Sequence, residues 1–269
     1  MSATDIIIRV ENLYAGYDDV AIQENVNFEV RRGEVFGILG GSGSGKTTIM
    51  KHMIGLIEPI SGHVYIDGDD IVTADEATRA AILRRFGVMY QSGALFGSMT
   101  LLENVRLPLE EYTDLPDDAI DLVARMKLEL VGLEGFTGHL PAELSGGMQK
   151  RAGIARAMAL DPSILFMDEP SSGLDPIVAA EMDELILFMK RMFNMTMLVV
   201  THELASAFRI ADRIAMLHEG SLIAVDENET FRASTDPRVR QFLDRVPDPV
   251  LDSEAFQQHL RQLGGFTGA

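Results

Sequence analysis

The chain of 269 residues has no cysteine and no tryptophan, and its 41 acidic residues far outnumber its 23 basic ones. Without cysteine, a disulfide framework, a thiolate zinc site and a cysteine nucleophile are all excluded. The formal net charge of −18 argues against a broad surface for the phosphates of DNA or RNA, and it does not favour direct binding to anionic lipid. We therefore expect no nucleic acid partner.

Long apolar runs are missing as well. No stretch reaches the roughly 20 apolar residues that a membrane-spanning helix needs. The first ten residues include Asp5 and lack the basic and apolar pattern of a signal peptide. The sequence therefore predicts a cytoplasmic protein whose contact with any membrane is indirect and made through partner proteins.

Short apolar runs alternate with helical patterns along most of the chain, which is typical of an α/β fold with a mainly parallel sheet. Strands are predicted at residues 6–10, 26–30, 35–39, 64–66, 86–89, 164–167, 197–201, 214–217 and 222–225. Helices are predicted at residues 46–56, 117–131, 147–159, 177–192, 204–211, 238–245 and 252–263.

The domain organisation follows from where this alternation stops. Between about residues 92 and 160 the pattern predicts helices and turns but no strand, which indicates a helical subdomain within one domain over residues 1–246. Residues 247–269 form a short tail with an amphipathic stretch. We expect this tail to dock on a partner chain or a second subunit; the alternative is a partly disordered terminus.

The strongest motif is the glycine-rich segment GGSGSGKT at residues 40–47, which lies between an apolar strand and a helical pattern. This is the pattern of a phosphate-binding loop, in which glycines let successive N–H groups converge on phosphate oxygens at a helix N-terminus. Lys46 is expected to neutralise the β- and γ-phosphates, and Thr47 to place its hydroxyl on Mg²⁺. The motif predicts nucleotide binding without separating a kinase, a GTPase, a helicase and a transport ATPase.

Two further motifs have the chemistry of a nucleotide site. The strand at 164–167 ends in Asp168, which suits a Mg²⁺ shell, and Glu169, which can accept a proton from an attacking water. An alternative for this pair is an ordinary acidic turn. Ser145, Gly146 and Gly147 open a later helix and form a second anion site, which serves either the chain's own nucleotide or that of a neighbour.

The order of these motifs resembles that of the nucleotide-binding subunit of an ABC transporter, over about residues 6–225. The matching elements are Tyr17, the Walker A loop at 40–47, Gln91 of the Q-loop, the signature at 144–149, the Walker B carboxylates Asp168 and Glu169, the D-loop at 172–175 and the switch histidine His202. The resemblance implies a P-loop ABC ATPase fold with a β-rich N-terminal part, ATP and Mg²⁺ as ligands, and ATP hydrolysis coupled to transport.

The resemblance also assigns residues to roles. Glu169, His202 and Gln91 are implied to be catalytic, and Thr47, Gln91 and Asp168 to hold Mg²⁺. Tyr17 is implied to stack on adenine. The other residues implied to bind ATP are Gly40, Gly41, Ser42, Gly43, Ser44, Gly45, Lys46, Thr47, Thr48, Ser145, Gly146, Gly147 and Asp175.

In this family two copies pair head to tail, and the signature of each copy caps the ATP held by the Walker A loop of the other. A homodimer is therefore implied. One departure is Met148, which stands where the signature usually has glutamine. Because Ser145 and the backbone of Gly146 and Gly147 carry the γ-phosphate contacts, we expect little loss of function.

Weaker signs in segments 90–96, 126–129 with 131–133, 144–148 and 236–243 together resemble the ATPases of the Mla-type, MCE-associated lipid transport systems. That resemblance implies phospholipid or other lipid trafficking, on the cytoplasmic side of the inner membrane of a diderm bacterium. It implies an MlaE-like permease, an MCE-domain protein and often a small STAS-domain subunit. In this family the region of residues 92–99 receives the coupling helix of the permease; the alternative for this segment is an ordinary buried loop.

Three alternatives stay open at this point. An ABC importer ATPase for another small solute, such as an amino acid, would carry the same catalytic motifs. A soluble ABC ATPase acting on DNA or the ribosome is disfavoured by the acidic charge and by the single set of motifs. A regulator that binds nucleotide without hydrolysing it is disfavoured by the presence of Asp168, Glu169 and His202.

Overall fold

The computed structural model describes residues 6–18 and 20–246. The chain divides into two compact units, the first ending at Ala233 and the second beginning at Ser234. The predicted domain boundary at 246 stays a prediction. The predicted helix at 252–263 and the docking of the tail at 247–269 lie outside the described residues.

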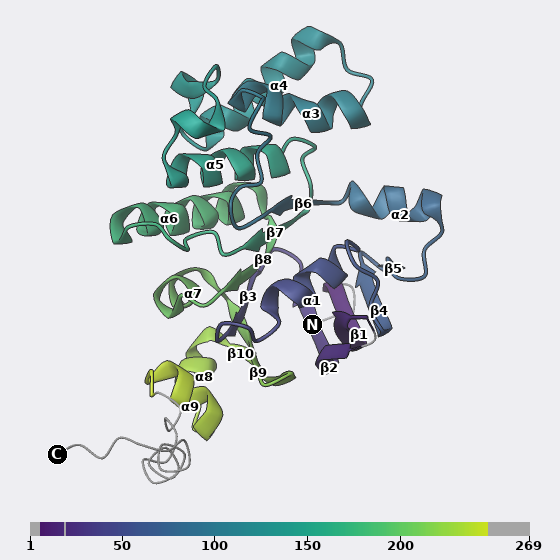
Figure 1. Ribbon diagram of the computed structural model, residues 1–269, viewed down its shortest axis with the longest axis vertical. Helices are drawn as coiled ribbons and strands as arrows, with labels where there is room; N and C mark the ends of the chain where they lie inside the picture. Colours follow the sequence, from purple (N-terminus) through teal and green to yellow (C-terminus); the bar gives the residue numbers. More distant parts are fainter. Residues whose placement is uncertain (1–5, 19, 247–269) are drawn as a thin grey trace, which may run out of the picture. The chain divides into compact units, whose positions relative to one another are not determined.

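Within the described part of the first unit, the larger β-sheet has the strand order β10–β9–β3–β8–β7–β6 (Figure 1). Every neighbouring pair is parallel except β9 and β10, whose tight connection makes them antiparallel. The strands of this sheet are β3 Val35–Gly40, β6 Phe86–Met89, β7 Ile164–Asp168, β8 Thr196–Thr201, β9 Arg213–His218 and β10 Ser221–Glu227. β3, β7 and β8 are buried along their whole length, as expected for strands covered on both faces.

A second, antiparallel sheet has the strand order β2–β1–β4–β5. Its strands are β1 Ile6–Tyr17, β2 Val20–Arg31, β4 Ser61–Ile66 and β5 Asp69–Asp70. It forms the predicted β-rich N-terminal part. The prediction for β1 stopped at residue 10, because irregular pairing after Val10 breaks the alternation of apolar and polar residues on which the prediction relied.

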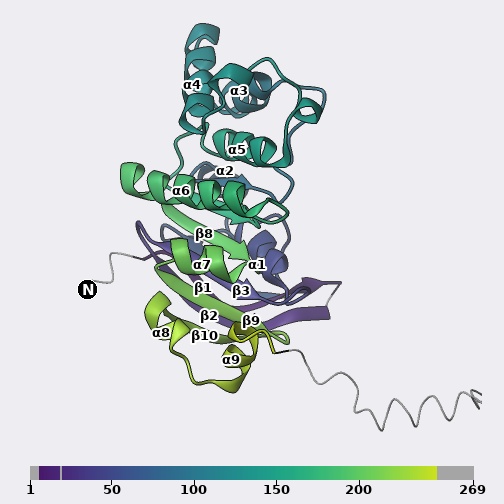
Figure 2. The same ribbon diagram turned by 90° about the vertical axis from the view of Figure 1, so that its left-hand side faces the viewer.

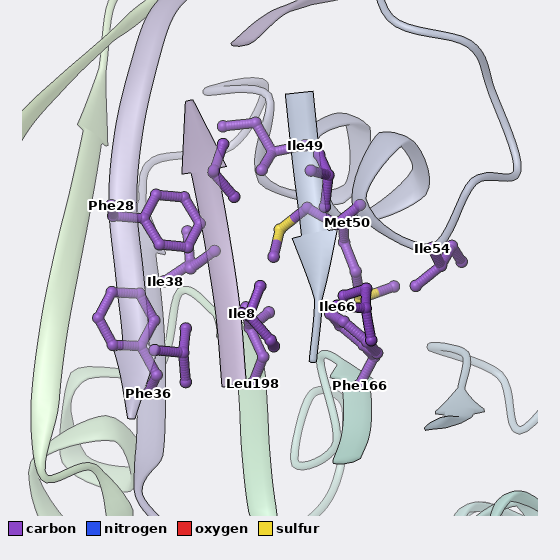
Figure 3. Close-up of a cluster of buried hydrophobic side chains, with 14 of the residues drawn as sticks. Ile8, Phe28, Phe36, Ile38, Ile49, Met50, Ile54, Ile66, Phe166 and Leu198 are labelled. Atoms are coloured by element: carbon purple, nitrogen blue, oxygen red, sulfur yellow. The ribbon is translucent and has the colours of Figure 1, made fainter. Parts of the chain in front are cut away.

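The main core lies between the two sheets, around helix α1 (Lys46–Met53). Ile49 and Met50 of α1 are fully buried. Figure 3 shows them beside Ile8 of β1, Ile66 of β4 and Phe166 of β7. Burying side chains of this size stabilises the fold by about 1.5–3 kcal/mol each. This core therefore fixes the helix that follows the glycine-rich loop, and with it the loop itself.

Helices α3 (Leu101–Tyr112), α4 (Asp117–Leu130) and α5 (Gly146–Ala157) lie between β6 and β7 in the chain. They pack on one another at one end of the first unit, at the top of Figure 1. Residues 92–160, all of which the structure describes, contain helices and turns but no strand. The prediction of a helical segment here is thus confirmed, although α3 itself was not predicted.

The remaining helices of the described residues are α2 Glu76–Leu83, α6 Pro176–Phe193, α7 Leu204–Ile210 and α8 Asn228–Arg232, with α9 Pro237–Leu243 in the second unit. Helix α6 connects β7 with β8, α7 connects β8 with β9, α2 precedes β6 and α8 follows β10. Figure 2 shows α6 and α7 on the side of the large sheet that faces the viewer. Of the helices in this described part of the chain, none combines the length and the apolar character that crossing a bilayer requires.

The loop before α3 is held by Asn104, a fully buried side chain on that helix. Its Oδ1 accepts from the Phe96 N–H at 2.8 Å, and its Nδ2 donates to the carbonyl oxygens of Phe96, Met99 and Thr100 at 3.0–3.1 Å. The side chain thus supplies hydrogen-bond partners to the Phe96 N–H and the Met99 carbonyl oxygen, and second partners to the carbonyl oxygens of Phe96 and Thr100, which also accept the N–H groups of Met99 and Asn104. It shapes the loop at residues 96–100.

We expect Asn104→Leu to lower the free energy of unfolding by about 2–4 kcal/mol. Leucine has a similar volume but makes none of these four hydrogen bonds, and it leaves the Phe96 N–H and the Met99 carbonyl oxygen without the partner that Asn104 provides. Urea denaturation of both proteins measures the difference. Glu111→Gln, an exposed change on the same helix, is the control and should shift stability by less than about 0.5 kcal/mol. Equal stability of Asn104→Leu and the parent would contradict this account of the loop.

Candidate functional site

The predicted site residues gather at the carboxyl edge of the large sheet. Because β3, β6, β7 and β8 are parallel, the segments that follow them leave the sheet at the same edge, where α/β proteins bind ligands. The glycine-rich loop follows β3, and Gln91 lies just after β6. Asp168 and Glu169 stand at the end of β7, and His202 comes directly after β8.

The glycine-rich loop has the backbone that its sequence predicts. Gly43 and Gly45 adopt positive φ angles of 76° and 82°, a region that side chains disfavour. A Cβ on Gly40 would lie 2.4 Å from Ser44 Oγ, so no other residue fits there. A Cβ on Gly41 or Gly43 would meet no atom of the described chain within 4 Å. The loop is therefore closed toward the sheet and open on the outside, as a phosphate cradle requires.

A cavity of about 490 Å³ lies over this loop, within the usual size range of small-ligand sites. Its described lining is Ile22, Ser42, Gly43, Gly45, Lys46, Thr47, Thr48, Gln91, Glu169 and His202. Loops that are distant in the sequence thus meet around one space.

Lys46 supplies the cation of the cavity. Its side chain is buried, with 8% of the residue exposed, and Nζ donates to the carbonyl oxygens of Gly40 and Gly41 at 3.0 and 2.9 Å. Burial lowers the pKa of Lys46, and the nearby carboxylates of Glu169 and Asp168 oppose that effect. An anion in the cavity would stabilise the charged form further. The loop carbonyl oxygens therefore hold Nζ of Lys46 beside the cavity, where it would neutralise the charge of an anion bound by the same loop.

Asp168 and Thr47 present oxygen atoms side by side. Thr47 Oγ1 donates to Asp168 Oδ1 at 3.1 Å. Burial raises the pKa of Asp168, while the hydrogen bond from Thr47 lowers it. A hydroxyl and a carboxylate are the ligand types that Mg²⁺ uses when substrate phosphates complete its shell. These two residues therefore fit a Mg²⁺ that arrives with a nucleotide, and Gln91 lines the same cavity.

Glu169 has different hydrogen-bond partners from Asp168, the residue before it. Its Oε1 lies 2.8 Å from Nδ1 of His202. Its Oε2 accepts from Thr201 Oγ1 at 3.2 Å. Glu169 also has a positive φ of 51°, which is uncommon for a residue with a side chain. Residues with such backbone conformations are often found at functional sites. The result is a buried carboxylate held in one orientation beside the cavity.

Several predicted residues do not reach this cavity within one chain. Tyr17 is 41% exposed at the end of β1 and is not among the described lining residues. Ser145 is exposed and caps α5, accepting from the Met148 N–H, and Asp175 is exposed and caps α6. Their exposed side chains are accessible to a ligand or to another copy of the chain.

The sequence analysis missed the contribution of β2. Gln23 is fully buried, and its Nε2 donates to the Ser44 carbonyl oxygen at 2.5 Å. The neighbouring Ile22 lines the cavity. Both belong to the antiparallel sheet, and neither lies in a recognisable motif. The sequence offered no signal for either residue, because Gln23 stands at one of the polar positions of an alternating apolar and polar strand.

Comparison with known proteins decides among the nucleotide-binding classes that the loop alone left open. A family model described as ABC transporter matches residues 23–172. The chain belongs to this ABC transporter ATP-binding family. It is therefore an ABC ATPase, which binds ATP with Mg²⁺ and hydrolyses it.

Individual relatives of this ABC ATPase cover most of the chain. The intermembrane phospholipid transport system ATP-binding protein MlaF of Haemophilus influenzae is 38% identical over 258 residues, which are 96% of this chain and 98% of that protein. The probable ribonucleotide transport ATP-binding protein mkl of Mycobacterium leprae is 41% identical over 238 residues, which are 88% of this chain and 69% of that protein.

A solved ATP-binding cassette has the same fold. It is a dimer in a post-hydrolysis state bound to ADP and Pi, and it superposes with a TM-score of 0.75 at 31% identity, covering 82% of this chain and 99% of its own. The prediction of an α/β ABC ATPase fold is thus confirmed.

Proposed function

We propose that this ABC ATPase powers the movement of phospholipid or another lipid across the bacterial envelope through a membrane permease. The observation that carries the proposal is the match to MlaF of Haemophilus influenzae, which spans nearly the full length of both chains. A second candidate substrate is a ribonucleotide, because the relative named for ribonucleotide transport has a slightly higher identity. That match covers a smaller share of the relative, so we favour the lipid.

The proposed working unit is a head-to-tail homodimer. In one chain the cavity holds Lys46, Thr47 and Glu169, whereas Ser145 and Asp175 are exposed elsewhere. A second copy would bring its own Ser145, Gly146 and Gly147 over the cavity, where the serine hydroxyl and the helix N-terminus of α5 would contact the γ-phosphate. The dimeric state of the solved cassette supports this arrangement.

The proposed roles within the site follow from the geometry. Lys46 and the loop N–H groups hold and neutralise the phosphates, and Glu169 accepts a proton from the attacking water. His202, hydrogen-bonded to Glu169, fixes the orientation of that carboxylate and reaches toward the γ-phosphate. Thr47 and Asp168, with Gln91 nearby, would hold a Mg²⁺ that arrives with the nucleotide and that would supply Lewis-acid stabilisation of the phosphate charge.

The proposed contact with the permease is the loop at residues 92–99. Phe96 in this loop is 50% exposed, and an exposed aromatic on a rigid support is typical of a protein interface. The support comes from Arg156 on α5, which donates to the carbonyl oxygens of Ala94 and Gly93 at 2.7 and 3.0 Å. The loop follows Gln91 directly, so it connects the permease contact with the ATP cavity.

An MlaE-like permease would place the ATPase at the cytoplasmic side of the inner membrane. An MCE-domain protein reached through that permease and a small STAS-domain subunit complete the proposed assembly. Contact with the membrane itself would be indirect, which agrees with the net charge of −18, because anionic lipid headgroups repel an acidic surface.

The substrate class is tested on the native complex, purified through an affinity tag on this chain and placed in phospholipid vesicles. We expect ATP-dependent transfer of labelled phospholipid, with none when Lys46→Ala replaces the parent chain. The same vesicles are offered labelled ribonucleotide and labelled amino acid as controls. ATP-dependent movement of either solute without phospholipid transfer would overturn the lipid proposal in favour of that substrate.

A further inference from the structure

Lys150 is a buried cation that the site described above does not use. It lies on α5 and only 7% of the residue is exposed. Its Nζ donates to the carbonyl oxygen of Glu169 at 2.9 Å and to that of Ser172 at 2.5 Å. Burial lowers the pKa of Lys150, and the charges of Glu169 and Asp168 oppose this effect. A lysine buried at this cost in solvation is best explained by the contacts it makes.

The two carbonyl oxygens bracket one turn of the chain. The turn leaves β7 at Glu169, whose φ of 51° is unfavourable for a side chain, and is closed by the Ser172 N–H, which donates to the Glu169 carbonyl oxygen at 3.3 Å. The ammonium group therefore ties both ends of this turn to α5. It holds the backbone from which the Glu169 carboxylate reaches His202.

The helix that carries Lys150 has a second connection. α5 begins at Gly146 with Ser145 as its cap, and Lys150 lies about one helical turn further along. In the proposed dimer, this helix start contacts the ATP in the partner's cavity, whereas Glu169 faces the ATP in the chain's own cavity. The Lys150 side chain thus connects α5, which contacts the ATP of the partner's cavity, to Glu169, which acts on the ATP of the chain's own cavity.

We propose that Lys150 is a positioning residue that couples the two ATP sites of the dimer, by tying the backbone of Glu169 and Ser172 to the helix that begins at Ser145. This inference rests on the proposed head-to-tail dimer. When ATP fixes the helix start, the turn and the Glu169 carboxylate are held in their working geometry. Without the ammonium group, α5 and the turn after Glu169 are no longer connected. ATP bound in one site then no longer affects the position of the Glu169 carboxylate in the other.

The first test compares Lys150→Met and Lys150→Arg with the parent in the purified transporter complex. Methionine keeps the unbranched apolar stem but donates no hydrogen bond, whereas the arginine guanidinium offers several donors to the same carbonyl oxygens. We expect kcat of Lys150→Met to fall about 10- to 100-fold, because a misplacement of a catalytic group by about 1 Å can cost about 10²-fold in rate. The ATP dissociation constant should stay within about twofold, and the Hill coefficient for ATP should drop toward 1. Lys150→Arg should recover most of kcat and of the Hill coefficient.

Lys127→Met is the matched control. Lys127 belongs to the same helical subdomain, and its Nζ contacts the exposed carboxylate of Asp161. Lys127→Met should leave kcat and the Hill coefficient unchanged. A parental kcat and Hill coefficient in Lys150→Met would overturn the proposal. If Lys150→Met is not recovered folded, Lys150→Gln and Lys150→Ala are compared instead. The glutamine amide is uncharged but can still donate to the carbonyl oxygens, so Lys150→Gln should have a higher Hill coefficient for ATP than Lys150→Ala.

A mixed dimer separates coupling between the sites from a local effect. One copy carries Glu169→Gln, so hydrolysis depends on the Glu169 of the other copy. We expect adding Lys150→Met to the inactive copy to lower the remaining rate, because the α5 of that copy caps the active site. A remaining rate that does not change would overturn coupling and leave Lys150 a purely local role. These readouts need no lipid, so they are independent of the substrate proposal, and failure to dimerise with ATP would reject the proposed assembly instead.

Discussion

Replacing Glu169 with glutamine is expected to lower the rate of ATP hydrolysis by the transporter complex at least about 100-fold, because general-base catalysis typically contributes 10²–10⁴ in rate. Glutamine keeps the shape of the side chain, and its amide oxygen can still accept from His202 and Thr201. It has no charge and cannot take a proton from water. Binding of ATP depends on the loop around Lys46 and should change less than about threefold.

Steady-state phosphate release from the purified complex and titration of a fluorescent ATP analogue measure these two quantities. Glu184→Gln is the control, because Glu184 is an exposed carboxylate on α6 that pairs with Arg209. It should hydrolyse ATP at the parental rate. If Glu169→Gln turned over ATP as fast as the parent, the assignment of the general base would be wrong. If it lost ATP binding as well, the carboxylate would instead be a binding group.

The sequence was sufficient for the parts of the fold whose signal is local. The buried strands β3, β7 and β8 were predicted because runs of apolar residues of that length suit few other positions. β5 was missed because Asp69 and Asp70 have no apolar signal, and it is defined only by its pairing with β4. α3 was missed in part because it contains Pro108, which normally ends a helix.

The site shows the same division between local and distant information. Lys46 and Thr47 could be predicted because they belong to the glycine-rich motif, and Asp168 and Glu169 because they stand at the end of an apolar strand. Parallel strands bring these carboxyl ends together. The partners from the other sheet, Gln23 among them, could not, since only the folded chain brings β2 to the loop. The contact of Lys150 with the turn after Glu169 was hidden for the same reason.

Some residues were predicted from the motif order and yet lie outside the cavity of a single chain. Ser145 and Asp175 are exposed at helix starts, although their motifs indicate nucleotide binding. The two observations agree if the site is completed by a second copy. The structure of one chain alone does not bring these residues to the cavity. The sequence motif still identifies them as nucleotide-binding residues, because it does not depend on which copy holds the nucleotide.

Replacing Lys46 with alanine is expected to weaken ATP binding by about 10- to 150-fold, since hydrogen bonds to a charged group contribute about 1.5–3 kcal/mol. The carbonyl oxygens of Gly40 and Gly41 also lose a donor, and because the bond to Gly40 is buried, the free energy of unfolding should fall by about 1–3 kcal/mol. The loss of affinity is therefore measured under conditions in which both proteins are folded.

The measurement is a titration of the complex with a non-hydrolysable ATP analogue and Mg²⁺, alongside thermal unfolding of the same samples. Lys51→Ala removes the same charge from the same helix, α1, but at a position outside the described lining of the cavity, so its affinity should stay within about threefold of the parent. A Lys46→Ala protein that bound the analogue as tightly as Lys51→Ala would show that the backbone N–H groups and the helix N-terminus suffice to hold the phosphates. The lysine would then act only on the charge that develops during hydrolysis, and its loss would appear in kcat alone.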